Sequence, residues 1–405
     1  MKLRNLISSL ILSFVIFQPS FAQEDVKQTT DEKKGYQFTI DKQLATTSVK
    51  DQYRSGTCWS FSGISFLESE LIRLKKGEFD LSEMYIVKKS YEDKAQRYVR
   101  MHGALNFGGG GALNDILNVI KIHGIMTEEA YSGLVIGEEG HIHGEMDGVC
   151  EAMVKEVINN KNQKLTPNWF EAFKGLTNAY LGKEPEKFNY KGKEYTARTF
   201  ADEVIGLNTN DYILMSSFTH HPFYEKFILE VPDNWSWGEV YNVQMDELIK
   251  TIDNAINNGY TVAWAGDVSE KGFNWKKGVA VVPEKDIESM SDLERAKWDE
   301  LSQKEKDEQL YSFDEAGKEK IITQELRQAA FDNFTTTDDH GMHIVGIAKD
   351  QNGTKFYLVK NSWNTKGNPY NGYLYMSESF IKYKTMSMMI NKASLPSDIA
   401  KKLKL

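Results

Sequence analysis

The segment DQYRSGTCWSF, residues 51–61, carries the strongest structural signal in the chain. Turn-forming residues lead up to Cys58, and the apolar residues over 58–77 recur at the three- and four-residue steps of a helix that ends at a glycine. A thiol at the first turn of a helix faces free backbone N–H groups, which lower its pKa and can hold an oxyanion. We therefore interpret Cys58 as a nucleophile. Gln52, on the other arm of the loop, is a candidate second oxyanion donor.

Two later segments supply partners for a thiol nucleophile. His340 lies where the turn of DDHGMHIVG, residues 338–346, enters an apolar strand, and Asn361 ends the next apolar run. Successive antiparallel strands would bring the two together, so that Asn361 orients the imidazole and Trp363 shields their hydrogen bond. Nucleophile, base and orienting group form the general arrangement of a catalytic triad.

Two neighbours of His340 compete for a role in this arrangement. His343 is the other candidate base, but three positions along a strand turn its side chain to the opposite face, which favours His340. Asp339 is interpreted as a turn residue and not as a member of the triad.

These segments resemble the signature segments of papain-like cysteine peptidases, in the same order along the chain. The bleomycin hydrolase and aminopeptidase C branch is the more similar one. Ser55 stands where papain has an additional cysteine, and Cys58 and His340 are far apart in sequence, as in that branch. Three further stretches are similar to the same branch: Leu81–Tyr85, Gly110–Gly124 and Tyr224–Asp267.

The resemblance implies thiol-dependent hydrolysis of peptide bonds at Cys58, His340 and Asn361, with Gln52 in the oxyanion hole. It implies an aminopeptidase acting on oligopeptides, without a metal or organic cofactor, and a homo-oligomer, since family members assemble as hexamers. Gly110 and Gly111 would lie beside the substrate backbone; a tight turn with close helix packing is the other interpretation of these glycines.

Three other functions stay open. A papain-type endopeptidase would share the site. Bleomycin hydrolases carry a longer C-terminal arm whose carboxylate captures the substrate amine in the cleft, whereas this sequence ends at Leu405 with a short basic tail, 397–405. Exopeptidase action is therefore a weaker prediction than peptidase chemistry. A thiol acyltransferase usually has an acid in place of Asn361, and a non-catalytic peptide-binding homologue would not need the complete set of four residues.

The pattern predicts the α+β class, and the resemblance implies a papain-like two-lobed fold, with a helical lobe and an antiparallel sheet or barrel lobe. Helical periodicity follows Cys58, Ser82 and Ala112 and recurs in Met245–Asn258. Strands are predicted at Tyr260–Trp264, Ile344–Ala348, Lys355–Lys360 and Tyr373–Met376. Helical insertions are expected at about 131–235 and 284–335, the latter highly charged and solvated.

The N-terminus has the layout of a secretory signal peptide. A short basic start precedes the apolar run 6–17, and Ala22 closes a small-residue cleavage site. We predict a signal peptide at 1–22, a disordered lead-in at 23–35 and a peptidase domain at 36–405. The mature protein would be secreted or periplasmic, with no membrane attachment after cleavage.

Composition and residue clusters restrict the remaining possibilities. A net charge of −9 argues against nucleic-acid binding. Of the two cysteines, Cys150 is interpreted as a small buried hydrophobe. Metal ligation is conceivable for one cluster, but it has no second ligand group at standard spacing, and a solvated loop is favoured: His141, His143, Glu145 and Asp147. The stretch 220–222 is likewise interpreted as a loop without a known partner.

Overall fold

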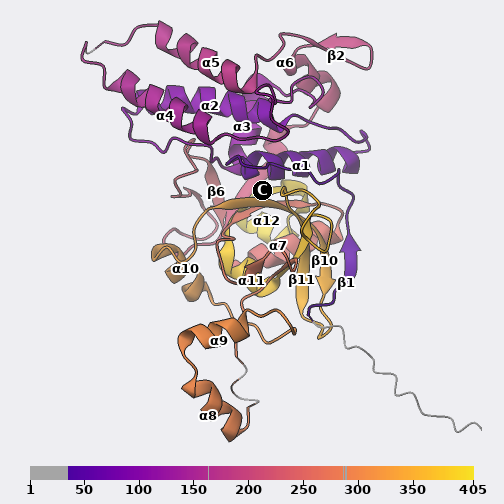
Figure 1. Ribbon diagram of the computed structural model, residues 1–405. Helices are drawn as coiled ribbons and strands as arrows, with labels where there is room; N and C mark the ends of the chain where they lie inside the picture. The colour runs from indigo at the N-terminus through magenta and orange to yellow at the C-terminus, as the bar shows by residue number, and fades with distance from the viewer. Residues whose placement is uncertain (1–34, 163, 286, 288–289) are drawn as a thin grey trace, which may run out of the picture. The chain divides into compact units, whose positions relative to one another are not determined.

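In the computed structural model, which describes residues 35–162, 164–285, 287 and 290–405, the helix predicted after Cys58 is present as α1 (Cys58–Arg73) (Figure 1). The predicted signal peptide and the predicted lead-in, apart from Gly35, lie outside the described residues. The division of the domain into a core and two insertions stays a prediction.

A layer of helices covers one side of α1. Helix α2 (Glu83–Arg100) begins after Ser82, whose hydroxyl accepts a hydrogen bond from the N–H of Tyr85, as the sequence predicted. Helix α3 (Leu113–His123) ends at Gly124, which has a φ of 86° that favours glycine. Helices α4 (Gly144–Ile158) and α5 (Asn168–Leu181) pack against α2 (Figure 1).

The other side of α1 packs against a large, mainly antiparallel sheet. Its strands follow the order β5-β6-β4-β13-β7-β10-β11-β12-β9-β8, and β1 also pairs with β10. Two pairs, β4 with β6 and β12 with β9, are parallel. The strands are β1 (Thr39–Gln43), β4 (Tyr212–Ser216), β5 (Lys226–Ile228), β6 (Glu239–Asn242), β7 (Val262–Gly266), β8 (Phe273–Asn274), β9 (Val279–Ala280), β10 (His340–Lys349), β11 (Lys355–Lys360), β12 (Tyr373–Ser377) and β13 (Thr385–Asn391).

A second apolar core joins the sheet to three helices: α7 (Met245–Asn257), α11 (Glu378–Lys384) and α12 (Ser397–Leu403). Helix α7 packs against β7 and β10, and α11 packs against α7. From α12, Ile399 and Leu403 are buried in the same core. The predicted basic tail is therefore a helix that is fixed to the sheet side of the protein.

The remaining elements are short. They are a hairpin of β2 (Phe188–Tyr190) and β3 (Lys193–Tyr195), the helical segments α6 (Ala197–Phe200), η1 (Ala201–Ile205), η2 (Thr209–Asp211) and η3 (Lys392–Ser394), and three helices in the charged stretch, α8 (Asp292–Glu300), α9 (Gln303–Leu310) and α10 (Gln324–Asp332). Trp298 is the buried residue of α8, and α9 has none. These two helices are solvated, as predicted.

Helix α10 differs from that prediction. Arg327 is buried, and its guanidinium donates to the backbone carbonyls of Ser217, at 2.8 Å, and Lys382, at 2.9 Å, and to that of Thr385. The charged composition of the stretch indicates solvent exposure, but one arginine satisfies carbonyl groups at the end of β4 and the start of β13. Burial of that side chain holds α10 against the sheet.

The predicted α+β papain-like class is confirmed, with differences at the strands. Strand β10 begins at His340, four residues before the predicted run, and β7 begins two residues after the predicted start because Gly259 and Tyr260 still close helix α7 through backbone hydrogen bonds. Strand β13 was not predicted: its buried, methionine-rich run lacks the alternation that marks a half-exposed strand. None of the helices in the described ranges is long and apolar enough to cross a membrane.

Candidate active site

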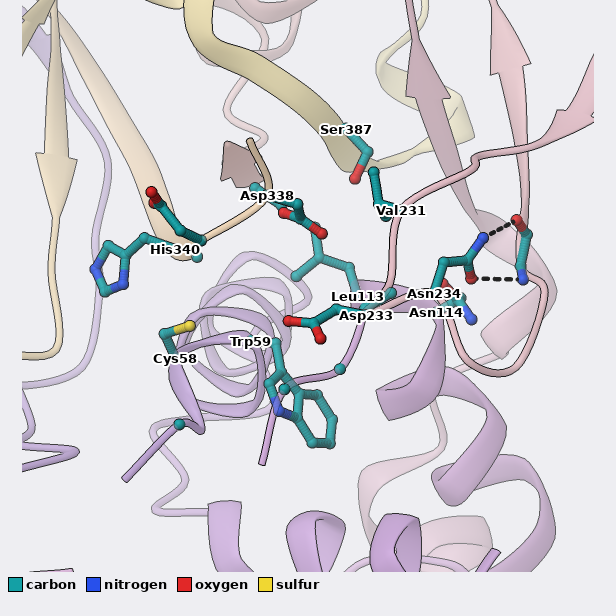
Figure 2. A pocket seen from close by; sticks show the side chains of 18 of the residues that line it. Cys58, Trp59, Leu113, Asn114, Val231, Asp233, Asn234, Asp338, His340 and Ser387 are labelled. Carbon is teal, nitrogen blue, oxygen red and sulfur yellow. Dashed lines mark hydrogen bonds between the residues drawn. The ribbon is translucent and has the colours of Figure 1, made fainter. Parts of the chain in front are cut away.

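Cys58 is the first residue of α1 and lies on the wall of a cavity of about 380 Å³. Residues of the helical layer and of the sheet line this cavity together. His340, the first residue of β10, lines the same cavity, and Figure 2 shows its side chain beside that of Cys58. The thiol is not in a disulfide, and Cys150 is also free and buried, as predicted for a small core residue.

His340 and Asn361 are joined by a hydrogen bond of 2.8 Å between His340 Nε2 and Asn361 Oδ1. The same oxygen accepts the backbone N–H of Ser362 at 2.7 Å, which identifies it as the acceptor and assigns the imidazole proton to Nε2. His340 Nδ1 is then the nitrogen left for the thiol. The ring centroid of Trp363 lies 4.7 Å from that of His340, so the indole covers the imidazole as the sequence predicted.

Burial determines the charge state of the two reactive groups. It raises the pKa of the Cys58 thiol to about 12, although the backbone N–H groups of Gly341 and Trp59 lower it. Burial also lowers the pKa of His340 to about 4, against the effect of Asn361. The Trp59 N–H at the helix start thus acts on the thiol pKa in the predicted direction, together with the Gly341 N–H of β10, but desolvation outweighs both. Between these values, both the thiol and the imidazole are neutral.

Gln52 is buried beside Cys58 and lines the same cavity. Its Nε2 donates to the carbonyl of Ser55 at 2.9 Å, and its Oε1 accepts from the hydroxyl of Ser362 at 2.7 Å. These bonds fix the orientation of the amide. Since an amide nitrogen carries two hydrogens, one N–H of Gln52 has no partner among the described residues and is available to an oxyanion.

The glycine run 108–111 has the close packing that was one of its two interpretations, and its predicted contact with the substrate backbone stays a prediction. Gly110 and Gly111 line the cavity, and both are packed closely: a Cβ at Gly111 would meet the ring of Trp59, and one at Gly110 would collide with the carboxylate of Asp233. Trp59 Nε1 donates to the carbonyl of Gly109 at 3.0 Å. Only glycine permits the chain to approach the nucleophile helix this closely.

The cavity also contains residues that the sequence did not single out. Asp233, in the loop between β5 and β6, and Asp338, before β10, are half-buried in its wall, and Ser387 of β13 joins them. Burial raises the pKa of Asp338 to about 8, with Asp233 and Asp339 adding to the effect. Asp338 could have been suspected from its position beside His340. No local signal marks Asp233, because tertiary contacts alone bring its loop to the cavity.

His343, the competing candidate base, is placed away from the cavity. It is fully buried, and its Nδ1 forms a hydrogen bond of 2.9 Å with the hydroxyl of Ser65. Lys360 donates to the same hydroxyl at 2.8 Å. The structure thus brings His340 to Cys58 and directs His343 to the opposite side of β10. Asp339 lies in the turn and accepts from the N–H of Val268.

Two histidine clusters differ from their predictions. His141 and His143 are buried, not solvated, and desolvation lowers the pKa of each to about 4. The polar sequence before His141 indicated solvent exposure. In the structure, the ring of His141 packs against that of Phe61, and the rings of His141 and His143 pack against each other. Among the described residues, neither His141 nor His143 belongs to a group of side chains that could hold a metal ion.

The second cluster, His220 and His221, does have a partner, Glu230, with Nε2–carboxylate distances of 3.1 and 2.6 Å. Its three side chains are close enough to hold a metal ion. However, Gln328 Nε2 donates to Nδ1 of His220, so Nε2 of a neutral ring carries the proton and donates to Glu230. The amide oxygen of Gln328 accepts the N–H of Thr219, which fixes the orientation of the amide and leaves its NH2 group to face His220. The arrangement fits a proton and not a metal.

Comparison with known proteins agrees with this geometry. The model of the family "Papain family cysteine protease" matches residues 36–195 and 310–394. Aminopeptidase C of Lactobacillus helveticus is 22% identical over 90% of this chain and 83% of its own length, and that of Listeria innocua is 22% identical over 95% and 90%. The crystal structure of PepW from Lactobacillus rhamnosis superimposes with a TM-score of 0.66 at 17% identity, covering 90% of this chain and 84% of that one. The chain therefore belongs to the papain family of cysteine proteases, on its aminopeptidase C branch.

Proposed function

We propose that this protein is a thiol aminopeptidase that removes residues from the free N-terminus of oligopeptides. The observation that carries the proposal is the cleft beside Cys58, where the loop 231–237 lies on Gly110 and presents the carboxylate of Asp233. A loop at this position limits the length of chain that can extend past the nucleophile. Similarity to aminopeptidase C relatives over nearly the whole chain supports the same activity.

In the proposed mechanism, His340 Nδ1 accepts the thiol proton while Cys58 attacks the peptide carbonyl. Asn361 holds the imidazole by its Nε2–H and stabilises the imidazolium that forms. The free N–H of Gln52 and the backbone N–H of Cys58 stabilise the oxyanion of the tetrahedral intermediate. His340 then protonates the leaving amine, and it activates water to hydrolyse the thioester.

Proton transfer within the pair explains how a desolvated, half-buried thiol reacts. Either charge alone is disfavoured by burial, which raises the thiol pKa and lowers the imidazole pKa. Transfer creates thiolate and imidazolium together, and their mutual attraction in a partly dry site offsets the desolvation of each. The charged nucleophile therefore depends on the presence of His340.

The test uses matched peptides with free and acetylated N-termini, with products identified by mass spectrometry. We expect stepwise removal of N-terminal residues from the free peptides and no cleavage of the acetylated ones. Cys58→Ala should reduce turnover at least about a thousandfold, and Cys150→Ser should leave it unchanged. Internal cleavage of both peptides at equal rates would identify an endopeptidase and refute the aminopeptidase proposal.

We also propose that the protein acts outside the cytoplasm, on the basis of the signal-peptide layout of residues 1–22. N-terminal sequencing of the protein from its native source should find Gln23 as the first residue. A chain that retains residues 1–22 in the cytoplasmic fraction would contradict this.

A further inference from the structure

One end of the catalytic cavity is acidic. Its wall contains Asp233 from the loop between β5 and β6, Asp338 from the turn before β10, and Ser387 from β13. Asp339, next to Asp338, is the third carboxyl residue of the cavity lining, and its carboxylate accepts the N–H of Val268. Figure 2 shows Asp233, Asp338 and Ser387 around the space next to Cys58. The cavity lining contains no lysine or arginine, within the part of the chain that the structure describes.

The polar atoms of this end are poorly satisfied by the protein. Ser387 is 5% exposed, yet its hydroxyl has no hydrogen-bond partner among the described residues, and the carboxyl of Asp338 has none among them either. Asp233 accepts one bond of 3.2 Å, from Asn106 Nδ2. Although the residue is largely buried, Ser387 Oγ is not among the fully buried unpaired side-chain atoms, so it faces the cavity and is available to a ligand.

Electrostatics favour a cationic ligand at this end. Burial raises the pKa of both Asp233 and Asp338, although the charge of Lys94 opposes the rise at Asp233. The nearest buried amine, Lys94, uses its donors on the carbonyls of Gly108 and Gly110. A positively charged group between the two carboxyls would stabilise both in their ionised form.

The position of Asp233 is specified by the fold. The side chain of Asn234 crosslinks the loop by hydrogen bonds. Its Nδ2 donates to the carbonyls of Leu229 and Gly238, at 2.9 Å each, and its Oδ1 accepts the N–H of Gly238 at 2.7 Å. Arg97 holds the carbonyl of Ser236 at 2.9 Å. The carboxylate is therefore presented on a fixed loop and not on a free one.

We propose that Asp233, Asp338 and Ser387 bind the α-ammonium group of the substrate's N-terminal residue. This inference rests on the proposed aminopeptidase function and names the groups that would enforce it. An ammonium has three N–H donors, and the site offers three acceptors. Both carboxylates are close enough to raise the pKa of the Cys58 thiol. An α-ammonium is two bonds from the attacked carbonyl carbon, so its counter-charges must lie near the nucleophile, as these do.

The experiment compares a substrate that has a free α-amine with an analogue that lacks only this amine. Wild type, Asp233→Asn and Asp338→Asn are assayed on leucyl-p-nitroanilide and on 4-methylpentanoyl-p-nitroanilide, which lacks only the α-amine. We expect each variant to lose roughly 10- to 100-fold in kcat/KM on the leucyl substrate, mainly through KM, as for loss of a charged hydrogen bond. On the analogue without the amine, the kcat/KM of each variant should equal or exceed that of the wild type. Ser387→Ala should show the same pattern with a smaller loss.

A matched control is Asp299→Asn, on the exposed surface of α8. It should change the kcat/KM of neither the leucyl substrate nor the analogue without the amine. Alkylation of Cys58 by iodoacetamide checks that each variant retains a folded site. Variants that keep the wild-type preference for the leucyl substrate would refute this inference while leaving the aminopeptidase proposal intact. If wild type itself shows no preference for the free amine, the aminopeptidase proposal fails, and this inference fails with it.

A lysine side chain carries the same ammonium chemistry, and a third substrate separates the two sources. On Nα-acetyl-lysyl-p-nitroanilide, we expect wild type and both aspartate variants to be equally slow. Faster cleavage of this substrate by wild type, lost in the aspartate variants, would assign the acidic end to a basic side chain and overturn the α-ammonium assignment.

Discussion

At the level of single residues, the proposed mechanism depends on transfer of the Cys58 proton to His340. The thiol pKa is raised to about 12 and the imidazole pKa lowered to about 4, both chiefly by burial. Asn361 positions the imidazole as the base, through the 2.8 Å hydrogen bond at His340 Nε2. Removing it leaves water as the acceptor for the thiol proton.

We therefore predict that His340→Ala slows alkylation of Cys58 by iodoacetamide at least about a hundredfold at pH 7. In the variant, the rate should rise about tenfold per pH unit between pH 7 and 10, since the thiolate fraction does so below a pKa near 12. The wild-type rate should depend much less on pH. Mass spectrometry of the adducts measures both rates.

Cys150 provides an internal control for this measurement. It is fully buried and burial raises its pKa to about 12, so the folded protein should take up one alkyl group and the unfolded protein two. If His340→Ala and wild type alkylate Cys58 at equal rates, the proposed proton transfer from Cys58 to His340 is contradicted.

At the level of elements, the contact between the glycine run and the loop 231–237 sets the shape of the cleft. The contact joins segments that are distant in sequence, and it depends on the absence of a Cβ at Gly110. Gly108, two residues earlier in the same run, has open space where a Cβ would be. The two glycines therefore form a matched pair.

We predict that Gly110→Ala lowers kcat/KM on leucyl-p-nitroanilide at least about tenfold, because the added methyl group displaces the Asp233 carboxylate. Gly108→Ala should stay within about twofold of wild type. Steady-state kinetics of the two purified variants measure the difference. Equal rates for both would show that the Gly110–Asp233 contact does not matter for turnover.

Other features of the elements show what local sequence could predict. The starts of α1 and α2 and the end of α3 follow from turn residues, an N-cap serine and a glycine with positive φ. Strand β13 and the burial of Arg327 did not follow, because a uniformly buried strand has no alternation and a buried arginine is recognised only by the carbonyls around it.

At the level of the whole molecule, the C-terminal helix contributes to stability and not to the site. None of residues 392–405 lines the catalytic cavity. Leu403 is buried in the core shared with α7, whereas Leu405, two residues later, is 49% exposed. The same residue type thus occupies a packed and an open position in one short segment.

We predict that Leu403→Ala lowers the free energy of unfolding by about 2–5 kcal/mol, as for large-to-small changes in a core. Leu405→Ala should change it by less than about 0.5 kcal/mol. Denaturant unfolding measures both, and turnover per folded molecule should be unchanged in each. A loss of turnover in folded Leu405→Ala would instead give the tail a role in catalysis.

The sequence by itself determined the family, the α+β class and the positions of Gln52, Cys58, His340 and Asn361. These follow from short segments in which residue type, turn chemistry and strand order act locally or between adjacent strands. Only the tertiary structure decided the rest: that burial outweighs the helix N-terminus at the thiol, and that Asp233, Asp338 and Ser387 meet at one end of the cleft. Desolvation and long-range packing cause both, and neither leaves a pattern in neighbouring residues.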